Sequence, residues 1–220
     1  MPHHEKALAA ILHQGLLPLF FHKSPEVSLQ VVKTLYQAGI RTLEYTNRGP
    51  AALENFTFLK AELSSDFPDL QLGIGTIKTV QEAQAFIAAG ADYIVCPVVN
   101  PQVGRLAHKA GLLWIPGCLT PTEIHVAQQE SAALIKIFPA NIMGPAYISS
   151  ISELFPGQLF IPTGGVEMDQ DNITGWFKAG VCAVGMGSKL ISKDILEQQQ
   201  YEKLRERTEE ALQMVQNSRS

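Results

Sequence analysis

The chain has 220 residues, of which 46% are hydrophobic and 17% charged, and this composition excludes a disordered protein. Its 17 Lys and Arg residues against 21 Asp and Glu give a net charge of −4, and the basic residues are scattered, which disfavours nucleic acid and anionic membranes as partners. No apolar run approaches the roughly 18 to 20 residues of a membrane span, and the first residues do not form a signal peptide. We therefore expect a cytoplasmic protein with a small-molecule or protein partner.

Three cysteines, Cys96, Cys118 and Cys182, are an odd number, and their spacing matches neither a zinc site nor a CxxC motif. Each lies in an apolar stretch, so buried free thiols are expected. The histidines likewise show no metal-ligand spacing, and no metal site is predicted.

Short β-rich apolar runs alternate with amphipathic stretches, which is typical of βα units around a parallel sheet. Eight strands are predicted, at residues 16–21, 42–46, 70–75, 93–97, 112–116, 133–138, 159–163 and 181–185. Helices are predicted between them, at residues 26–38, 51–63, 80–89, 121–129, 144–154 and 171–178. Four Ala-Gly pairs place a glycine after a helical run, where a left-handed cap is favoured, at Gly39, Gly90, Gly111 and Gly180.

Eight βα periods in 220 residues predict an α/β fold, a compact (β/α)8 TIM barrel that forms a single domain over residues 1–220. A doubly wound open sheet is the alternative, but no GxGxxG turn follows the first strand. An additional helix at about residues 5–14 is expected to close the bottom of the barrel. One polar helix at about residues 194–216 is expected to pack on the outside.

Active sites of such barrels form at the carboxyl ends of the strands, so polar residues that end an apolar strand are candidates. These residues are Glu44, Thr76, Lys136, Thr163 and Ser188. Two glycine turns, at residues 162–166 and 185–188, follow the last two strands, where barrels often bind phosphate through backbone amides. Without a Walker-type motif, the turns suggest a phosphorylated sugar-like substrate rather than a nucleotide.

Lys136 is the strongest candidate for an active-site residue because it lies mid-strand between Ile135 and Ile137. If the isoleucines pack under the helices, the amine faces the barrel interior, where desolvation favours the free amine that attacks a carbonyl as a Schiff-base nucleophile. Glu44 lies in a similarly apolar strand and would transfer protons. The pattern leaves two alternatives open, namely a structural ion pair between Lys136 and Glu44 or a lysine that reaches solvent from an edge strand.

Two further residues can bind a substrate carboxylate. Arg48, in the loop four residues after Glu44, either grips a carboxylate through two parallel hydrogen bonds or is a solvated surface residue. Thr76, which ends the GIGT turn, either hydrogen-bonds the same carboxylate or caps the next helix, and the two roles are compatible.

The motifs LEYTNRG, GIGT, IPGCLTPTE, IKIFPAN, PTGG and VGMGS occur in this order over about residues 17–190. Together they resemble the 2-keto-3-deoxy-6-phosphogluconate (KDPG) / 4-hydroxy-2-oxoglutarate (KHG) aldolases, class I enzymes on a (β/α)8 barrel. The resemblance implies that Lys136 is the Schiff-base lysine, Glu44 the acid/base, and Arg48 with Thr76 the binders of the pyruvate-derived carboxylate.

The same resemblance implies that Thr163 contributes to facial selectivity and that the phosphate is held by Gly164, Gly165, Gly187 and Ser188. The family is typically a cytosolic homotrimer that requires no metal and no other cofactor, and its substrate is a small keto acid.

The sequence departs from the family pattern in places. Some members carry an arginine at the end of strand one, whereas this chain has LFFHKS, leaving His22 or Lys23 as substitutes. After strand four it reads CPVVNP, where many members have a serine and a PG turn. The stretch KIFPANIMGPAYI leans toward the related 2-keto-3-deoxy-6-phosphogalactonate aldolase, whereas Arg48 leans toward the gluconate and oxoglutarate enzymes.

The expected reaction is reversible cleavage of KDPG to pyruvate and glyceraldehyde 3-phosphate, with cleavage of KHG to pyruvate and glyoxylate as a second activity. Three alternatives remain: the phosphogalactonate aldolase, a metal-free isomerase or synthase, and a non-catalytic sugar-phosphate-binding barrel.

Overall fold

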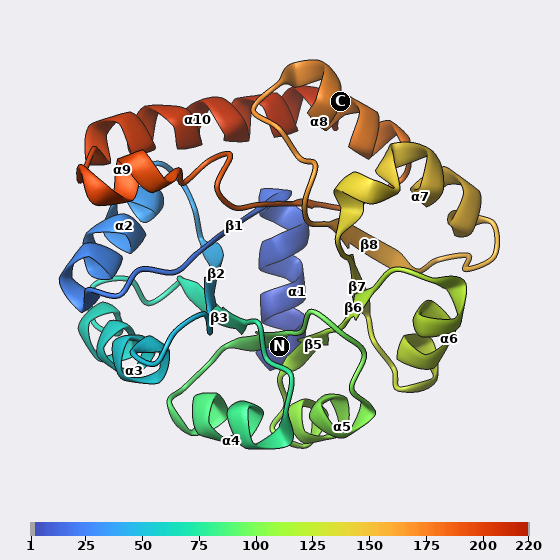
Figure 1. Cartoon of the computed structure of the whole chain (residues 1–220), viewed down its shortest axis with the longest axis horizontal. Helices are drawn as coiled ribbons and strands as arrows, with labels where there is room; N and C mark the ends of the chain where they lie inside the picture. Colours follow the sequence, from blue (N-terminus) through green and yellow to red (C-terminus); the bar gives the residue numbers. More distant parts are fainter. Residues whose placement is uncertain (1–2, 220) are drawn as a thin grey trace.

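The computed structural model describes residues 3–219 and places parallel strands inside a ring of helices (Figure 1). The strands are β1 (Leu16–Phe20), β2 (Thr42–Thr46), β3 (Gln71–Gly75), β4 (Tyr93–Val95), β5 (Leu113–Ile115), β6 (Gly117–Cys118), β7 (Leu134–Ile137), β8 (Leu159–Pro162) and β9 (Val184–Met186).

The helices mostly follow the strands in alternation and cover their outer face. They are α1 (His3–Gln14), α2 (Pro25–Gln37), α3 (Ala52–Leu63), α4 (Val80–Ala88), α5 (Pro101–Lys109), α6 (Pro121–Gln129), the short 3₁₀ helix η1 (Ala140–Ile142), α7 (Gly144–Ser152), α8 (Gln170–Lys178), α9 (Lys193–Glu197) and α10 (Tyr201–Ser218). Helix α5 was not predicted, although Gly111, the cap glycine that follows it, was. The four predicted cap glycines all have positive φ.

The strands form a curled parallel sheet in an α/β fold. Six strands pair in the order β5-β4-β3-β2-β1-β9, and three pair in the order β6-β7-β8. A short strand that was not predicted, β6, follows the strand predicted at 112–116 and is separated from β5 by Pro116, which has no N–H to donate to a ladder. Its carbonyl oxygen instead accepts from the Lys136 N–H (2.9 Å). A single backbone bridge between Thr163 and Gly185 joins the end of β8 to β9.

Two predictions for the last part of the chain are wrong in detail. The single helix expected at 194–216 is two helices, α9 and α10, because Gln199 adopts a left-handed conformation (φ 52°) that ends the first helix. The predicted stripe of α10 is nevertheless buried, at Leu204, Thr208, Ala211 and Val215. The eighth strand, expected at 181–185, is displaced to β9.

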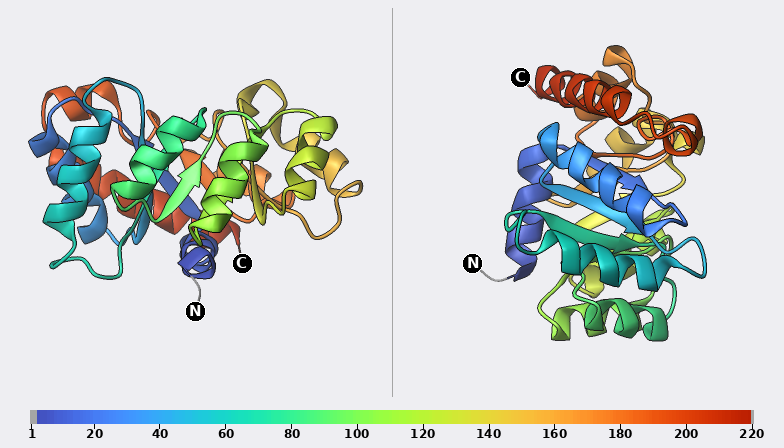
Figure 2. Two further views of the ribbon diagram at one scale, coloured as in Figure 1. Left: turned by 90° about the horizontal axis from the view of Figure 1, so that it is seen from below. Right: turned by 90° about the vertical axis from the view of Figure 1, so that its left-hand side faces the viewer.

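The alternation of side chains divides the core into two clusters. Ile135 and Ile137 belong to the outer cluster, which lies between the strands and the surrounding helices. The inner cluster contains Ala7 and Ile11 of α1, both fully buried, together with inward-facing strand residues such as Leu134. Helix α1 therefore covers one end of the strands, as predicted, and the left view of Figure 2 shows it below them.

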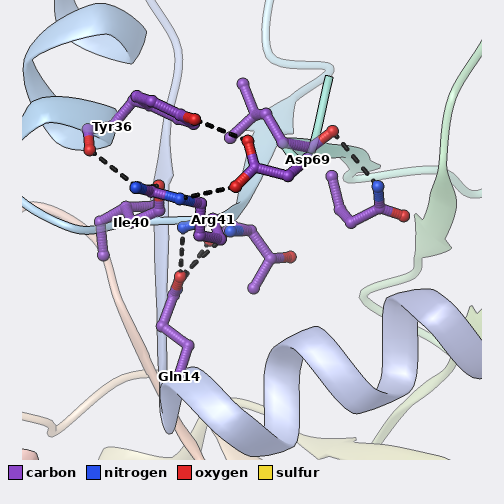
Figure 3. Close-up of polar contacts among 8 residues, drawn as sticks. Gln14, Tyr36, Ile40, Arg41 and Asp69 are labelled. Atoms are coloured by element: carbon purple, nitrogen blue, oxygen red, sulfur yellow. Dashed lines mark hydrogen bonds and ion pairs between the residues drawn. The ribbon is translucent and has the colours of Figure 1, made fainter. Parts of the chain in front are cut away.

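Gln14, the last residue of α1, fixes this helix to the amino ends of β1 and β2 (Figure 3). Its amide nitrogen donates to the carbonyl oxygens of Leu16 and Thr42, and its Oε1 accepts from the N–H groups of Arg41 (2.6 Å) and Thr42 (3.1 Å). The Arg41 guanidinium continues the network to Asp69 (Nε–Oδ2 2.9 Å). One side chain thus satisfies backbone groups of two strand ends that the sheet leaves open.

Cys96 and Cys118 are buried free thiols, as predicted, whereas Cys182 is only half-buried. Within residues 3–219, the structure contains no helix with the length and apolar character needed to cross a bilayer.

Candidate active site

Lys136 of β7 and Glu44 of β2 meet in the interior, where Lys136 Nζ lies 3.5 Å from Glu44 Oε2. Lys136 is 6% exposed and Glu44 is 1% exposed. The two strands are not neighbours in either sheet, so the contact crosses the interior between the strands. The predicted inward orientation of both side chains is confirmed. Such a pair combines an amine with a carboxylate that can accept or return a proton.

Two strand glycines make room for the polar side chains. A Cβ added to Gly75 would lie 1.8 Å from Glu44 Oε1, and one added to Gly185 would lie 2.3 Å from Thr163 Oγ1. Only glycine therefore admits the Glu44 carboxylate and the Thr163 hydroxyl where they stand. This role was not predicted from the sequence, although an isolated glycine inside a strand is a recognised sign of close approach.

A cavity of about 400 Å³ lies at the carboxyl ends of the strands, next to the pair. Six of the predicted site residues line it: Arg48, Thr163, Gly164, Gly165, Gly187 and Ser188. Lys136, Glu44 and Thr76 are not part of its wall. Phe138 connects the two regions, because it lines the cavity and its ring centroid is 5.4 Å from Lys136 Nζ.

The rim of the cavity carries positive charge from Arg48, Lys189 and Lys193. Lys189 pairs with Glu167 (2.9 Å) and Lys193 with Glu197 (3.5 Å), but these ion pairs are exposed and weak. The charges are therefore available to a small anion that enters the cavity.

The glycine turn after β8 allows close backbone approach. Gly164 and Gly165 have φ angles of 90° and 76°, a conformation that other residues rarely adopt. A Cβ on Gly165 would lie only 2.8 Å from the Cα of Asn141. Main-chain N–H groups in such a turn can be presented to an anionic oxygen.

The wall near the end of β1 is aromatic rather than cationic. Phe21 lines the cavity and packs against Gly49, where an added Cβ would lie 2.9 Å from the Phe21 ring. His22 accepts a hydrogen bond from the Ser24 N–H through Nδ1 (3.1 Å), and Lys23 is exposed. Neither His22 nor Lys23 lines the cavity, whereas Phe21, which was not predicted from the sequence, does.

Thr76 follows β3 directly and has a φ angle of 63°, which is unfavourable for a β-branched residue. The suggestion that it caps the next helix is wrong. The N-cap of α4 is Thr79, whose side chain accepts from the Glu82 N–H in a capping box. The Thr-x-x-Glu spacing of these two residues is the sequence signal that was overlooked.

Two other groups near the interior stay uncharged. Burial raises the pKa of the Cys96 thiol to about 12, which leaves it protonated and a poor nucleophile. Burial also raises the pKa of Tyr93 well above its usual value, and its hydroxyl donates to the Leu43 carbonyl oxygen (2.7 Å). Among residues 3–219, no three His, Cys, Asp or Glu side chains are grouped so that they could hold a metal ion.

Comparison with known proteins gives consistent matches. The family model for KDPG and KHG aldolase matches residues 9–207. A protein of Treponema pallidum named 2-dehydro-3-deoxy-phosphogluconate aldolase is 32% identical over 155 residues, which cover 70% of this chain and 72% of that protein. A Rhizobium meliloti protein named probable 2-dehydro-3-deoxy-6-phosphogalactonate aldolase is 31% identical over 191 residues, covering 86% and 84%.

A solved structure shows the same fold. It is KDPG aldolase from Legionella pneumophila with pyruvate captured at low pH as a covalent carbinolamine intermediate, with a TM-score of 0.83 and 25% identity. The match covers 95% of this chain and 97% of that chain. Because the family model and the relatives extend over most of the sequence, the chain belongs to the KDPG and KHG aldolase family.

Proposed function

We propose that this protein is a class I aldolase that cleaves KDPG to pyruvate and glyceraldehyde 3-phosphate, with KHG cleavage as a second activity. The observation that carries the proposal is the Lys136 amine, enclosed by the strands and 3.5 Å from Glu44. An isolated buried ion pair is a poor stabiliser, so stability alone gives little reason for this pair. The names of the relatives and the pyruvate adduct of the Legionella enzyme support the same reaction.

In the proposed reaction, the free amine of Lys136 adds to the C2 ketone and loses water to form an iminium ion. The cation draws electrons from the C3–C4 bond, which breaks to give an enamine. Glu44 receives the proton of the C4 hydroxyl, and the aldehyde leaves. Protonation of the enamine at C3 and hydrolysis of the imine then release pyruvate and restore the amine.

The other predicted residues bind and orient the substrate in this proposal. Arg48 and Thr76 hold the carboxylate, and Thr163 controls the face of the carbonyl that reacts. The phosphate binds at Gly164, Gly165, Gly187 and Ser188. The cavity wall at the glycine turns and its cationic rim support this assignment, since both suit an anion.

We also propose a closed (β/α)8 barrel. Two features support closure: β6 continues the path of β5 after one residue, and the Thr163–Gly185 bridge links β8 to β9. A homotrimer in the cytoplasm is part of the same proposal, and light scattering on the purified protein tests the trimer.

Borohydride reduction in the presence of pyruvate tests the central step. The expected result is a stable mass increase, matching one reduced pyruvate, on the peptide that contains Lys136. Omission of pyruvate and the Lys136→Met variant are the controls. If no label appears under conditions that label a known class I aldolase, the Schiff-base proposal is wrong.

A second candidate is the 2-keto-3-deoxy-6-phosphogalactonate aldolase. It is favoured by the Rhizobium relative, whose match covers more of this chain than the Treponema match does. Both candidates share the lysine chemistry, and their substrates differ in the configuration at C4. Cleavage rates for the gluconate, galactonate and oxoglutarate substrates, measured side by side by pyruvate release, distinguish them. An absence of turnover with all three would support a non-catalytic barrel.

A further inference from the structure

Two neighbouring loops carry the residues that we propose to bind the substrate carboxylate. Arg48 lies in the loop after β2, and Thr76 lies in the loop after β3. The two strands pair in parallel with Thr46 opposite Gly75, so both loops start side by side. The Asn47 N–H also donates to the Gly75 carbonyl oxygen (2.8 Å). The relative position of the loops determines whether both side chains can reach one carboxylate.

Glu82, in the first turn of α4, contacts both loops. Its Oε2 accepts from the N–H groups of Lys78 (2.8 Å) and Thr79 (3.0 Å) in the loop after β3. Its Oε1 accepts from the side-chain amide of Asn47 (3.3 Å), the residue directly before Arg48. One carboxylate thus ties the two loops together through its two oxygens.

The chain contains a second capping box that lacks this tie. At the start of α6, Glu123 Oε2 accepts from the N–H groups of Leu119 (2.7 Å) and Thr120 (2.8 Å), as Glu82 does in α4. Within the described residues, no side chain from a neighbouring strand loop donates to Glu123. A capping box therefore does not require a hydrogen bond from a neighbouring loop. The hydrogen bond from Asn47 to Glu82 needs an explanation other than helix capping.

The strained backbone of Thr76 is a second indication that these loops must be held in place. Its φ angle of 63° is unfavourable, and a strained residue persists only where the surrounding structure holds it. The Ile77 N–H donates to the Val95 carbonyl oxygen (3.3 Å), and Glu82 fixes Lys78 and Thr79 just beyond it. Arg48, by contrast, is exposed and has no ion pair among residues 3–219. Its loop gains its anchor from Asn47.

We propose that Glu82 is a positioning residue that, through Asn47, holds the Arg48 loop against the Thr76 loop so that both side chains bind one keto-acid carboxylate. The inference rests on the proposed function, because it assumes that these two residues bind the substrate. Glu82 itself does not contact the reacting atoms. Its effect should therefore fall on substrate binding, and the chemical step should change little.

The test measures the pyruvate concentration that gives half-maximal borohydride labelling, together with KM, kcat and Tm. Asn47→Ala removes the tie and leaves the capping box intact. We expect it to raise KM and the half-labelling concentration by about fivefold, the value of one hydrogen bond, with kcat nearly constant. Glu82→Ala should raise both by a similar factor and also lower Tm, because the cap is lost.

Glu123→Ala is the matched control. It removes the equivalent cap from α6 and should lower Tm by a similar amount while KM stays at the wild-type value. Glu82→Gln, unlike Glu82→Ala, should keep KM near the wild-type value, since glutamine also forms capping boxes and its amide can pair with that of Asn47. Adding Asn47→Ala to Glu82→Ala should change KM no further, because both substitutions break the same contact.

Three results would overturn the inference: an unchanged KM in Asn47→Ala, an equal rise of KM in Glu82→Ala and Glu123→Ala, or additive effects in the double variant. In each of these cases the wild-type protein would still be labelled, and the proposed function would stand. If the wild-type protein is not labelled by pyruvate at all, the proposed function fails, and the inference falls with it.

Discussion

The two ends of the strands are built differently. At the amino ends, the Gln14 side chain is saturated by backbone groups of β1 and β2, and the adjacent interior holds apolar residues such as Ile11. At the carboxyl ends, Lys136 and Glu44 have each other as their closest charged partner, and a cationic cavity lies beside them. The first arrangement is typical of groups that stabilise a fold, and the second of groups that act on a ligand.

The difference suggests that stability and activity are separated along the strand axis. Substitutions at the amino ends should lower the free energy of unfolding and leave turnover unchanged. Substitutions at the carboxyl ends should lower turnover and leave the free energy of unfolding unchanged. The exception is a substitution that leaves a buried charge without its partner, which also lowers the free energy of unfolding. Three predictions test this separation, and a fourth tests how tightly the strands stay closed around the buried thiols.

The largest effect is expected at Lys136. Lys136→Met removes the proposed nucleophile and should lower the rate of pyruvate release by at least about 10³-fold. It also leaves the Glu44 carboxylate buried without its counter-ion, which should cost about 3–5 kcal/mol of unfolding free energy. The double variant Lys136→Met/Glu44→Gln should recover much of that stability and remain inactive. A single variant that keeps a tenth of the activity would contradict the assignment.

At the opposite end, Ile11→Ala should lower the free energy of unfolding by about 2–5 kcal/mol, because the fully buried side chain leaves a cavity between α1 and the strands. Urea unfolding measures this change. The kcat/KM for the keto acid should stay at the wild-type value, and Ala9→Ser on the exposed face of α1 is the control for both measurements. A parallel loss of kcat/KM at temperatures where the variant is folded would show that the two ends are coupled.

Gly73 and Gly75 provide a matched pair on the same face of β3. A Cβ on Gly75 would lie 1.8 Å from Glu44 Oε1, whereas one on Gly73 would lie 2.0 Å from the Tyr93 ring. Gly75→Ala should displace the carboxylate and lower kcat by about 10–100-fold. Gly73→Ala should destabilise the protein by about 1–3 kcal/mol through overpacking and retain activity. Equal losses of kcat in both variants would mean that the strand distorts as a whole.

The smallest effect concerns the cysteines. Burial raises the pKa of Cys96 and of Cys118 to about 12 and that of Cys182 to about 11. At pH 8 the native thiols are therefore protonated, and they should react with a disulfide reagent far more slowly than the same thiols in denaturant. Since unfolded thiols lose their protons near pH 9, stability should fall as the pH rises above that value. Rapid labelling of the native protein at pH 8 would show that the strands open readily.

The sequence predicts the site well where the signal is local. Lys136 stands between two isoleucines, and period-2 alternation alone indicates that it faces away from the helices. The cap glycines, such as Gly39, are equally local, because a helix end determines the conformation that they need. The same reasoning places Glu44 inside, although it does not show which residue Glu44 meets.

Local sequence patterns do not predict contacts between segments that are far apart in the chain. Asn47 and Glu82 are 35 residues apart, and nothing in either motif indicates that their side chains bond. The aromatic wall at Phe21 was not predicted either. The chemistry of His22 and Lys23 made them the candidates to replace the arginine found at the end of strand one in some members. The break between α9 and α10 coincides with the left-handed conformation of Gln199, which the polar composition of the segment does not indicate.

The amino-acid order by itself indicated most of the alternation of strands and helices, the inward face of strands such as β7, and the side chains that are candidates for the chemistry. Folding in three dimensions decided that an amine and a carboxylate 92 residues apart would lie 3.5 Å from each other. It also decided which glycines make room for the Glu44 and Thr163 side chains and where a cavity opens at the carboxyl ends of the strands. The physical reason is that the face a side chain occupies depends on its immediate neighbours, whereas distances across the interior depend on how all the strands curl together.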